Sequence, residues 1–401
     1  MDLLTNKKIV LGVTGSIAAY KVCELARNLT LAGAQVDVVL TEAAERFVGS
    51  ATFQALTGRP VLSDMWSLPE DGVVGHVSLG LHADLVVVAP ATANTLARIA
   101  AGLSDDLLTT TLLATTAPVL LAPAMNPHMY ANPATQANLA TLRARGYTLL
   151  EPVEGRMAEP MIGKGRLPEP ATLEGEIRAL LGRLGGPLRG RRVVISAGGT
   201  REPIDPVRFV GNRSSGQMGY ALAAAARDMG AAVTLISGPT ALTPPTAVAT
   251  VQVETTAEML GAVRVACLEA DLLVMNAAVA DFRPAQQSAE KIKKQGDSGL
   301  TLELVPNPDI LRELLDLTGL FKVGFAAETN DLLANARGKL DRKGLAMIVA
   351  NDAISSIGQP AIQLTIIDHA GVNSMPQMLK AEAAAALMAE IADRYHTYVN
   401  R

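Results

Sequence analysis

The sequence predicts two consecutive α/β domains, each with a parallel sheet covered by helices. Continuous apolar runs of strand length, such as residues 85–89, are typical of parallel strands that are buried on both faces. Stretches with helical periodicity alternate with these runs, which is the pattern of a doubly wound fold. The pattern stops at a Gly- and Pro-rich segment, 183–190, and then restarts, so we expect domains at residues 1–187 and 188–401.

The first domain is expected to open with a strand–helix–strand unit. Residues 8–13 form a short apolar run, residues 16–31 have the periodicity of an amphipathic helix, and residues 36–40 form the next apolar run. Two further uninterrupted apolar runs, at residues 85–89 and 119–122, predict additional buried strands of the same sheet.

The second domain is expected to open in the same way, although its sequence is not a repeat of the first. A strand at residues 192–197 leads into a Gly-rich turn, and an Ala-rich helix is predicted over 218–229. The remaining predicted strands are 233–236, 272–275, 322–325 and 347–350.

The composition excludes several classes of protein. Lys and Arg total 35 and Asp and Glu total 39, and a net charge of −4 gives no general attraction to nucleic acid or anionic membranes. Residues 107–142 carry no charged side chain, but four prolines interrupt them, so we do not expect a membrane-spanning helix. Because no signal-peptide pattern precedes the first strand, we expect a cytoplasmic protein.

The chain has two cysteines, Cys23 and Cys267. Two thiols are too few for a disulfide-dense scaffold or for a Cys-based zinc site. We interpret both as small buried apolar side chains rather than as catalysts.

The turn after the first predicted strand has the features of a phosphate site. Glycines at positions 12 and 15 permit a tight turn, and Ser16 stands near the start of a helix whose free N–H groups attract anions. An ordinary strand–helix turn with an N-cap explains the same residues. The run is not Gly-x-Gly-x-x-Gly, so a standard dinucleotide site is not predicted.

Two polar loops follow buried strands at their carboxyl ends, where open α/β sheets bind ligands. They are Pro-Ala-Thr-Ala-Asn-Thr at 90–95 and Pro-Ala-Met-Asn-Pro-His-Met-Tyr at 123–130. Together with Gly-Val-Thr-Gly-Ser-Ile-Ala-Ala-Tyr-Lys at 12–21 and His76, these loops strongly resemble the FMN-dependent cysteine decarboxylases. The resemblance covers about residues 6–182 and includes the decarboxylase half of the bifunctional enzymes of coenzyme A biosynthesis.

The resemblance implies a flavodoxin-like domain that decarboxylates 4′-phosphopantothenoylcysteine. FMN would oxidise the cysteine thiol to a thioaldehyde, which favours loss of carbon dioxide, and would then return a hydride. His76 would be the catalytic histidine near the substrate carboxyl, and Asn126 would hydrogen-bond that carboxylate. The implied FMN-binding residues are Gly15, Ser16, Ile17, Thr41, Thr92, Ala93, Ser104 and Met125.

One departure from that family lies in the segment that corresponds to its flap. Family members usually carry a cysteine there that protonates the enethiol, whereas Glu159 aligns with that position in this chain. Three explanations remain open: Glu159 donates the proton, another group does, or the reaction stops after decarboxylation. A carboxylic acid can serve as the donor when its pKa is raised.

The second half carries an ordered set of motifs. Gly-Gly-Thr-Arg-Glu-Pro at 198–203 precedes Asn-Arg-Ser-Ser-Gly-Gln-Met-Gly at 212–219, where serines and a glycine at a helix start suit phosphate. Residues 277–282, the basic run 291–294 and the segments 307–310 and 324–329 follow in order. The series resembles the phosphopantothenate–cysteine ligase half of the same bifunctional enzymes, over about residues 188–398.

This second resemblance implies a Rossmann-like, CTP-dependent ligase that needs Mg²⁺. The carboxylate of 4′-phosphopantothenate would attack CTP, releasing pyrophosphate, and the amine of cysteine would then attack the acyl-cytidylate. Asn212 and Lys291 would be catalytic, Arg208 would contact substrate, and Asp281 would hold nucleotide or metal. The implied CTP-binding residues are Ser214, Ser215, Gly216, Met275, Asn276, Ala277, Asp281, Lys291, Pro308, Asp309, Ile310, Phe325, Lys339 and Lys343.

We therefore expect a bifunctional, homo-oligomeric enzyme of coenzyme A biosynthesis, and the resemblance implies a dodecamer. The alternative is an active ligase fused to a flavin-binding regulatory or scaffolding domain, because the flap cysteine is missing. A flavin prenyltransferase-like first half is less compatible with the ligase motifs that follow it.

Overall fold

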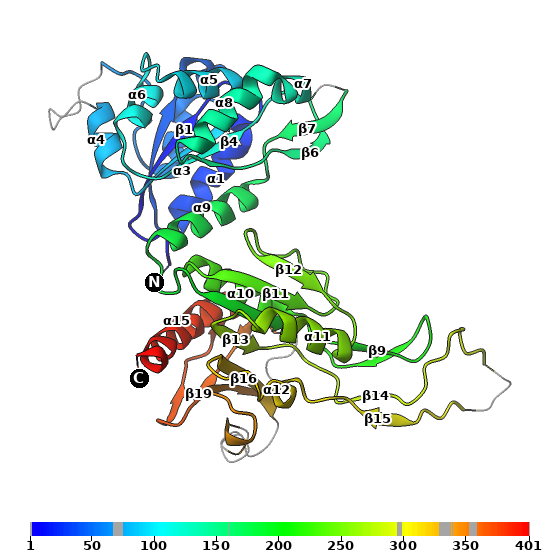
Figure 1. The fold of residues 1–401 in the computed structure, drawn as a ribbon. Helices are drawn as coiled ribbons and strands as arrows, with labels where there is room; N and C mark the ends of the chain where they lie inside the picture. The colour runs from blue at the N-terminus through cyan, green and yellow to red at the C-terminus, as the bar shows by residue number, and fades with distance from the viewer. Residues whose placement is uncertain are drawn as a thin grey trace. The chain divides into compact units, whose positions relative to one another are not determined.

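The computed structural model describes residues 2–66, 75–158, 160–294, 299–328, 338, 340–352 and 359–400. Two residues with predicted roles, Glu159 and Lys339, lie outside these ranges. The chain divides into two compact units, Met1–Leu181 and Gly182–Arg401, which are described separately (Figure 1).

The first unit is built on a five-stranded parallel sheet in the order β2-β1-β3-β4-β5. This is the strand order of flavodoxin, so the predicted flavodoxin-like fold is confirmed. The strands are β1 (Lys8–Val13), β2 (Gln35–Leu40), β3 (Leu85–Ala91), β4 (Val119–Pro123) and β5 (Thr148–Leu149). The helices are α1 (Ala19–Leu31), α2 (Glu42–Glu45), α3 (Ser50–Thr57), α4 (Gly75–His82), α5 (Ala93–Ala101), α6 (Leu107–Ala114), α7 (Pro127–Ala131), α8 (Pro133–Ala144) and α9 (Pro170–Gly185), the last crossing the division between the units.

Helices cover both faces of this sheet, which explains why its strands are uniformly apolar. Every residue of β3 is buried, and alternate residues of the strand belong to two different cores. One core includes Val22 and Leu25 of α1, and the other includes Leu96 of α5. A two-stranded ribbon, β6 (Val153–Arg156) with β7 (Ile162–Arg166), contacts α7 at one end of the unit.

The second unit contains an eight-stranded sheet in the order β12-β11-β8-β13-β16-β17-β19-β20. Its first six strands are parallel and follow the Rossmann order 3-2-1-4-5-6, while β19 and β20 add an antiparallel edge. The strands are β8 (Arg192–Ala197), β11 (Ala232–Ser237), β12 (Ala249–Gln252), β13 (Leu272–Met275), β16 (Phe321–Glu328), β17 (Met347–Asp352), β19 (Thr365–Ile367) and β20 (Val372–Ser374).

Helices also cover both faces of the second sheet. On one face, α10 (Gln217–Asp228) packs against α15 (Lys380–Val399), and their Leu222 and Leu387 share a core. On the other face, α11 (Thr256–Cys267) and α12 (Ile310–Glu313) share a core that includes Met259 and Leu311. A short ribbon, β18 (Ala361–Ile362) with β21 (Met378–Leu379), precedes α15.

An arm projects from the second unit (Figure 1). It consists of two antiparallel ribbons, β9 (Arg201–Pro203) with β10 (Phe209–Gly211) and β14 (Phe282–Pro284) with β15 (Leu304–Pro306). Phe209 and Phe282 on these strands are each about half exposed. Sequence patterns did not predict the arm because its apolar residues are not buried in a core.

The expected absence of a membrane span agrees with the helices of the described segments, none of which is long and apolar enough to cross a bilayer.

Candidate active sites

In the first unit, the loops after β1 and β3 meet where the strand order reverses, which is the ligand-binding edge of such a sheet. The Thr14 hydroxyl donates to the Pro90 carbonyl at 2.6 Å and accepts from the Thr92 N–H at 3.0 Å. Gly15 lies so close to α2 that a Cβ on it would be 2.5 Å from Ala43 Cβ. The structure therefore brings the turn at 14–17 and the loop at 90–95 together.

The predicted helix start at residue 16 is wrong by three residues, because α1 begins at Ala19. The Ser16 N–H donates to the Thr14 carbonyl, and Ser16 Oγ accepts from the Ala18 N–H at 3.3 Å, so residues 14–18 form a separate turn. Ile17 is 59% exposed at this edge of the sheet. A turn of backbone amides before a 13-residue helix retains the geometry of an anion site.

Two helix caps place further predicted FMN residues at this edge. Thr41 caps α2 and its hydroxyl lies 3.4 Å from the Val13 carbonyl, while Thr92 caps α5 by accepting from the Thr95 N–H. Ala93 is the first residue of α5. These caps fix the loop conformations locally, as Ser and Thr do at helix starts.

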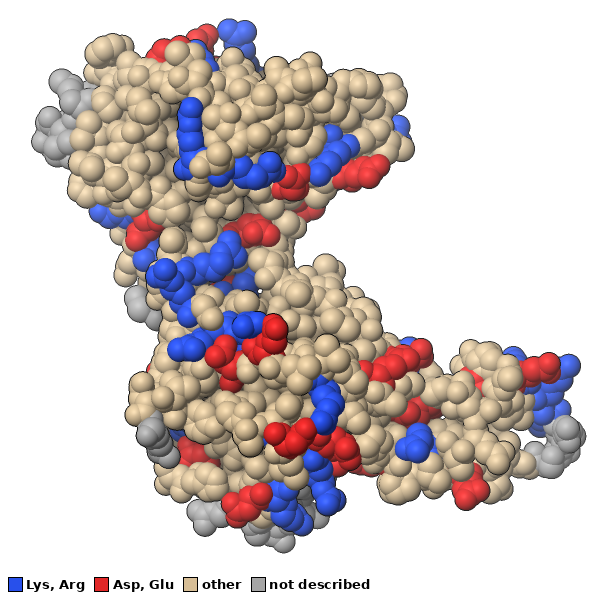
Figure 2. Space-filling model, viewed as in Figure 1, with Lys and Arg blue, Asp and Glu red and all other residues tan. Residues whose placement is uncertain are grey.

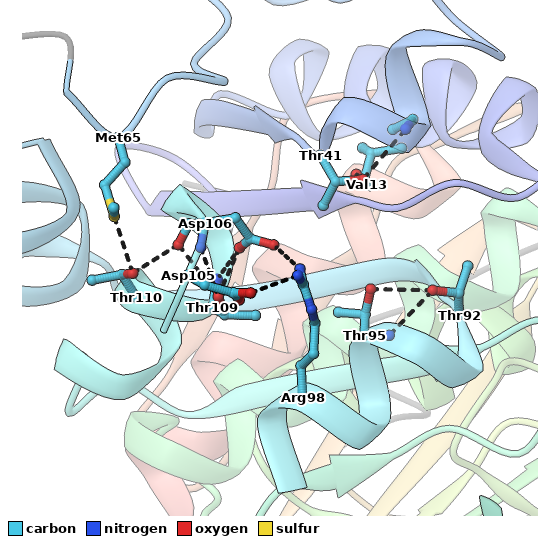
Figure 3. A network of polar contacts seen from close by, with 11 residues as sticks. Val13, Thr41, Met65, Thr92, Thr95, Arg98, Asp105, Asp106, Thr109 and Thr110 are labelled. Atoms are coloured by element: carbon cyan, nitrogen blue, oxygen red, sulfur yellow. Dashed lines mark hydrogen bonds and ion pairs between the residues drawn. The ribbon is translucent and has the colours of Figure 1, made fainter. Parts of the chain in front are cut away.

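Ser104 lies in the loop between α5 and α6, and ion pairs from Arg98 of α5 hold the residues that follow it. The Arg98 guanidinium pairs with Asp105 and with Asp106, each at 2.7 Å, and Asp106 in turn caps α6 through Thr109 (Figure 3). The double ion pair ties the end of α5 to the start of α6, so the Ser104 segment has a fixed path.

The ribbon β6–β7 packs on the loop that carries Met125 and Asn126. The Met125 N–H donates to the Gly165 carbonyl at 2.9 Å, and a Cβ on Gly165 would lie 2.2 Å from Met125 O. Asn126 caps α7, and its Nδ2 is 3.8 Å from Met161 Sδ. Only glycine fits at position 165, so the ribbon and the loop keep close contact.

A polar cluster supports the same ribbon. The Tyr130 hydroxyl donates to Glu151 at 2.7 Å, and Glu151 also pairs with Lys164 of β7 at 2.7 Å. Burial, together with the hydrogen bond to the Glu151 carboxylate, raises the pKa of Tyr130 to about 12. Tyr130 therefore remains a neutral donor at neutral pH.

His76 stands apart from this group. It lies in the first turn of α4, and within the described part of the chain its buried Nδ1 has no hydrogen-bond partner. Helices α4 and α7 lie at opposite ends of the first unit (Figure 1). A single chain therefore does not bring His76 and Asn126 together.

In the second unit, a cavity of about 480 Å³ opens at the carboxyl ends of β13, β16 and β17. Most of the CTP-binding residues predicted from the sequence line it: Met275, Asn276, Ala277, Asp281, Pro308, Asp309, Ile310, Phe325 and Lys343. Asn212, which was predicted to be catalytic, lines it as well. Sequence reasoning assigned no role to Asn307 or Asn351, which also line it. The sequence could have pointed to Asn351, because it directly follows an apolar run of strand length, and ligands bind at the carboxyl ends of such strands.

Several contacts shape the cavity wall. The buried Ser196 hydroxyl accepts from the backbone N–H groups of Asn276 and Ala277, at 3.1 and 3.0 Å. Asn212 Nδ2 donates to the Val279 carbonyl at 2.8 Å, and Lys343 Nζ is 2.8 Å from Asp309 Oδ2. The Lys343–Asp309 ion pair, Asn212 and the backbone of residues 276–277 thus belong to one cavity wall, and contacts within the protein fix their positions.

The predicted phosphate loop borders this cavity through Gly199. A Cβ on Gly199 would lie 2.8 Å from Asn212 O, 3.5 Å from Ser214 Cβ and 3.6 Å from Ala278 O. Gly216 adopts a φ of 75° at the N-cap of α10, and its N–H donates to Ser214 Oγ at 3.3 Å. Ser215 lies between them in the same loop. The loop and the cavity are therefore neighbours, although the serines are not part of the cavity wall.

Arg208 and Lys291 were expected at this site, but they are not among its lining residues. Arg208 donates to Asp205 Oδ2 at 2.6 Å and to the Ile292 carbonyl at 2.6 Å, so its guanidinium joins β9–β10 to the segment at 292. Burial would raise the pKa of Asp205, but hydrogen bonds from Val207, Arg208 and Ile292 outweigh it and hold that pKa below its usual value.

Lys291 precedes Ile292, whose carbonyl accepts from Arg208, and it is exposed. Lys293 and Lys294 are exposed as well. Figure 2 shows Lys and Arg side chains gathered at the outer end of the arm. The basic run therefore belongs to the arm rather than to the cavity wall.

Among the described residues, no group of three or more His, Cys, Asp or Glu side chains could hold a metal ion. Asp281 and Asp309 nevertheless both line the cavity. Mg²⁺ commonly binds through one or two carboxylates and the phosphates of a nucleotide, so this donor set fits Mg²⁺ carried with a triphosphate.

Neither cysteine has the surroundings of a catalyst. Cys267 is 4% exposed in the core beneath α11, and burial raises its pKa to about 12. Burial also raises the pKa of the half-buried Cys23 thiol. Thiols with raised pKa values are poor nucleophiles at neutral pH.

Comparison with known proteins accounts for both halves. A family model described as "Flavoprotein" matches residues 2–182, and one described as "DNA/pantothenate metabolism flavoprotein C-terminal domain" matches residues 188–395. The coenzyme A biosynthesis bifunctional protein of Vibrio cholerae is 47% identical over 397 residues, which are 97% of this chain and 98% of that protein. The chain belongs to the family of coenzyme A biosynthesis bifunctional proteins.

Other members of this family show similar agreement. The Bacillus subtilis coenzyme A biosynthesis bifunctional protein is 45% identical over 97% of this chain and 98% of its own length. A crystal structure of the C-terminal domain of a coenzyme A biosynthesis bifunctional protein covers 53% of this chain and 100% of that chain, at 40% identity and a TM-score of 0.46.

Proposed function

We propose that this chain catalyses two consecutive reactions of coenzyme A biosynthesis in the cytoplasm. Residues 188–401 ligate 4′-phosphopantothenate to cysteine at the expense of CTP. Residues 1–187 then decarboxylate 4′-phosphopantothenoylcysteine to 4′-phosphopantetheine with FMN. Membership of the bifunctional family over nearly the whole chain supports both activities.

The observation that carries the ligase half is the cavity beside the Ser214–Gly216 loop. Its wall combines the Lys343 ammonium with the Asn212 amide and the backbone of Asn276 and Ala277. Lys343 offsets the repulsion between the substrate carboxylate and a triphosphate as the carboxylate attacks the α-phosphorus. Asn212 holds the acyl carbonyl while the cysteine amine attacks it, and CMP leaves.

Mg²⁺ accompanies CTP in this proposal. Within the described part of the chain, Asp281 is the carboxylate of the cavity wall that forms no ion pair, whereas Asp309 is paired with Lys343. We therefore assign Asp281 as the protein ligand of Mg²⁺, with the remaining ligands supplied by phosphate oxygens and water.

In this proposal, Lys291 and Arg208 act from the arm rather than from the cavity wall. Asp205 and Arg208 anchor the segment next to Lys291, which leaves the Lys291 ammonium on an exposed loop. We propose that this loop delivers Lys291 to the activated carboxylate.

The first unit fits FMN by the shape of its turn and loops. Gly15 permits close approach, the turn at 14–18 precedes the start of α1, and Thr41 and Thr92 present caps at the same edge. Bound FMN supplies two-electron oxidation and reduction of the substrate. The residues of the chain bind and orient: Asn126 donates through Nδ2 to the substrate carboxylate, and the ribbon β6–β7 excludes water from it.

We propose that the decarboxylase site is shared between copies of the chain. His76 and Asn126 lie at opposite ends of one unit (Figure 1), so a site that uses both requires a second copy. The buried Nδ1 of His76 has no hydrogen-bond partner among the described residues, which supports a partner supplied from outside the chain. A closed homo-oligomer, such as the dodecamer that the family resemblance implies, would provide such sites.

One incubation tests the two activities together. Purified protein is mixed with 4′-phosphopantothenate, cysteine, CTP and Mg²⁺, and pyrophosphate and carbon dioxide are measured in the same sample. Release of both in equal amounts supports the proposal. Pyrophosphate without carbon dioxide would leave the ligase and reject the decarboxylase, and release of neither would reject both.

A further inference from the structure

A buried carboxylate meets the start of helix α11 behind the cavity of the second unit. Glu202 on β9 is 3% exposed, and Thr256, the first residue of α11, is fully buried. Glu202 Oε1 accepts from the Thr256 N–H at 2.8 Å and from the Thr256 hydroxyl at 2.7 Å. Free N–H groups at the start of a helix stabilise such a carboxylate.

The bond to Glu202 determines the direction of the next hydrogen bonds. A threonine hydroxyl has one proton and two lone pairs, and Thr256 gives its proton to Glu202. In the 3.1 Å contact between the Thr200 and Thr256 hydroxyls, Thr200 is therefore the donor. Asn307 Nδ2 donates to the second lone pair of Thr256, at 3.2 Å. The Thr256 hydroxyl is thus saturated.

This network ends on two segments of the cavity wall. Thr200 Oγ1 accepts from the Ala280 N–H at 2.8 Å, and Asn307 Nδ2 also donates to the Ala280 carbonyl at 2.9 Å. The Asn307 N–H donates to the Asp281 carbonyl at 2.8 Å. Ala280, Asp281 and Asn307 all line the cavity. The segments at 277–281 and 307–310 are therefore fastened to each other and to α11.

We propose that Glu202 and Thr256 are positioning residues for the nucleotide cavity, acting through Thr200 and Asn307. This inference rests on the proposed ligase function. It assigns the Asn307 amide to the fold rather than to base recognition, because Nδ2 has two protein acceptors and Oδ1 accepts from Arg283 at 3.2 Å. Loss of the Thr256 hydroxyl leaves the Thr200 hydroxyl and one of the two Asn307 Nδ2 protons without their acceptor, while Asn307 keeps its bond to the Ala280 carbonyl. Both wall segments are thereby loosened from α11.

Three variants of the full-length chain test the proposal. Thr256→Val keeps the shape of the side chain and removes the hydroxyl, whereas Thr256→Ser keeps the hydroxyl. The control is Thr365→Val in the same unit, which removes a hydroxyl contact to Ser374 at 3.2 Å on an exposed edge of the sheet. Pyrophosphate release is measured against CTP and against cysteine, with a thermal melt of each variant.

The Thr256→Val variant is expected to raise the KM for CTP about tenfold, while the KM for cysteine changes less than about twofold. Thr256→Ser and Thr365→Val are expected to keep the wild-type KM for CTP. A protein that is merely less stable loses active molecules and therefore kcat, with unchanged KM. An unchanged KM for CTP in folded Thr256→Val, or an equal rise in Thr256→Ser, overturns the proposal.

Hydrogen–deuterium exchange of the ligand-free variants gives a second readout that does not depend on activity. Faster exchange confined to residues 277–281 and 307–312 is expected in Thr256→Val, and not in Thr365→Val. Exchange that rises uniformly over the unit, or not at all, overturns the proposal. If wild type releases no pyrophosphate from CTP, the ligase assignment fails, while the exchange experiment still decides whether the network holds these segments.

Discussion

Lys343 and Asp309 form an ion pair within the wall of the cavity of the second unit, with 2.8 Å between Nζ and Oδ2. Both side chains are partly exposed, so solvent screens the pair and a triphosphate competes readily for the ammonium. The pair thereby holds the Lys343 ammonium in the cavity wall, where a phosphate of the proposed ligand can replace Asp309 as its partner.

Replacement of Lys343 tests that function. Lys343→Gln is expected to raise the KM for CTP at least about tenfold, since one charge-assisted contact to phosphate is lost. The measurement is the initial rate of pyrophosphate release against CTP concentration. Arg342→Gln is the matched control, because it removes a neighbouring positive charge that does not line the cavity. Equal effects of both variants would indicate a general charge effect instead.

His76 is expected to serve only the decarboxylase. His76→Asn should abolish carbon dioxide release and leave pyrophosphate release and bound flavin unchanged. His82→Asn, at the other end of α4, is the control, because His82 instead contacts its own helix at the Ser78 carbonyl, 2.9 Å away. Carbon dioxide release at the wild-type rate by His76→Asn would exclude its catalytic role.

Mixing two inactive variants tests whether the decarboxylase site is shared. When His76→Asn and Asn126→Ala chains are unfolded together and refolded as one assembly, sites with both wild-type residues form between unlike chains. About a quarter of wild-type carbon dioxide release is then expected from random assembly. Refolding of each variant by itself is the control, and a mixture as inactive as its components contradicts the shared site.

Gly165 offers a test of the contact between the ribbon β6–β7 and the Met125 loop. Gly165→Ala places a Cβ 2.2 Å from Met125 O, so the ribbon must move and flavin retention is expected to fall severalfold. Gly155→Ala on the paired strand is the control, because its Cβ would meet only Arg166 side-chain atoms at 3.5 Å or more. Visible flavin absorbance per chain after purification is the measurement, and equal retention in both variants counts against the contact.

Acid should weaken the second unit through Asp205. Because hydrogen bonds hold its folded pKa below the unfolded value of about 3.9, its contribution is complete above that value and is lost as pH falls below about 4. Urea unfolding of wild type and Asp205→Asn should therefore differ most at pH values near neutral. The difference should narrow below about pH 4, and a gap that widens with acid would contradict the assignment.

The sheets could be predicted from sequence because burial on both faces leaves an unbroken apolar run. The predicted strands 8–13, 192–197 and 272–275 have the same bounds as β1, β8 and β13. The arm could not be predicted in this way. Leu304 of β15 is 43% exposed and Phe282 of β14 is 50% exposed, so hydrophobicity along these ribbons does not report burial.

The positions of several predicted site residues at one edge of the second sheet could be predicted for a related reason. Asn276 and Pro308 line the cavity because they follow strands or precede a helix at the carboxyl edge, which sequence order reveals. The placement of Arg208 depends on Asp205, three residues away, and on Ile292 across the arm. A sequence does not disclose which of several partners a guanidinium will select, because that choice depends on long-range geometry.

The single hydroxyl of Thr14 connects the turn after β1 to the loop after β3. For directed evolution, this means that the two loops have to be redesigned as one unit. A library that varies residue 14 alone also disturbs the path of residues 90–92, so apparent failures at one loop would originate in the other. New specificity at this edge calls for varying both loops together.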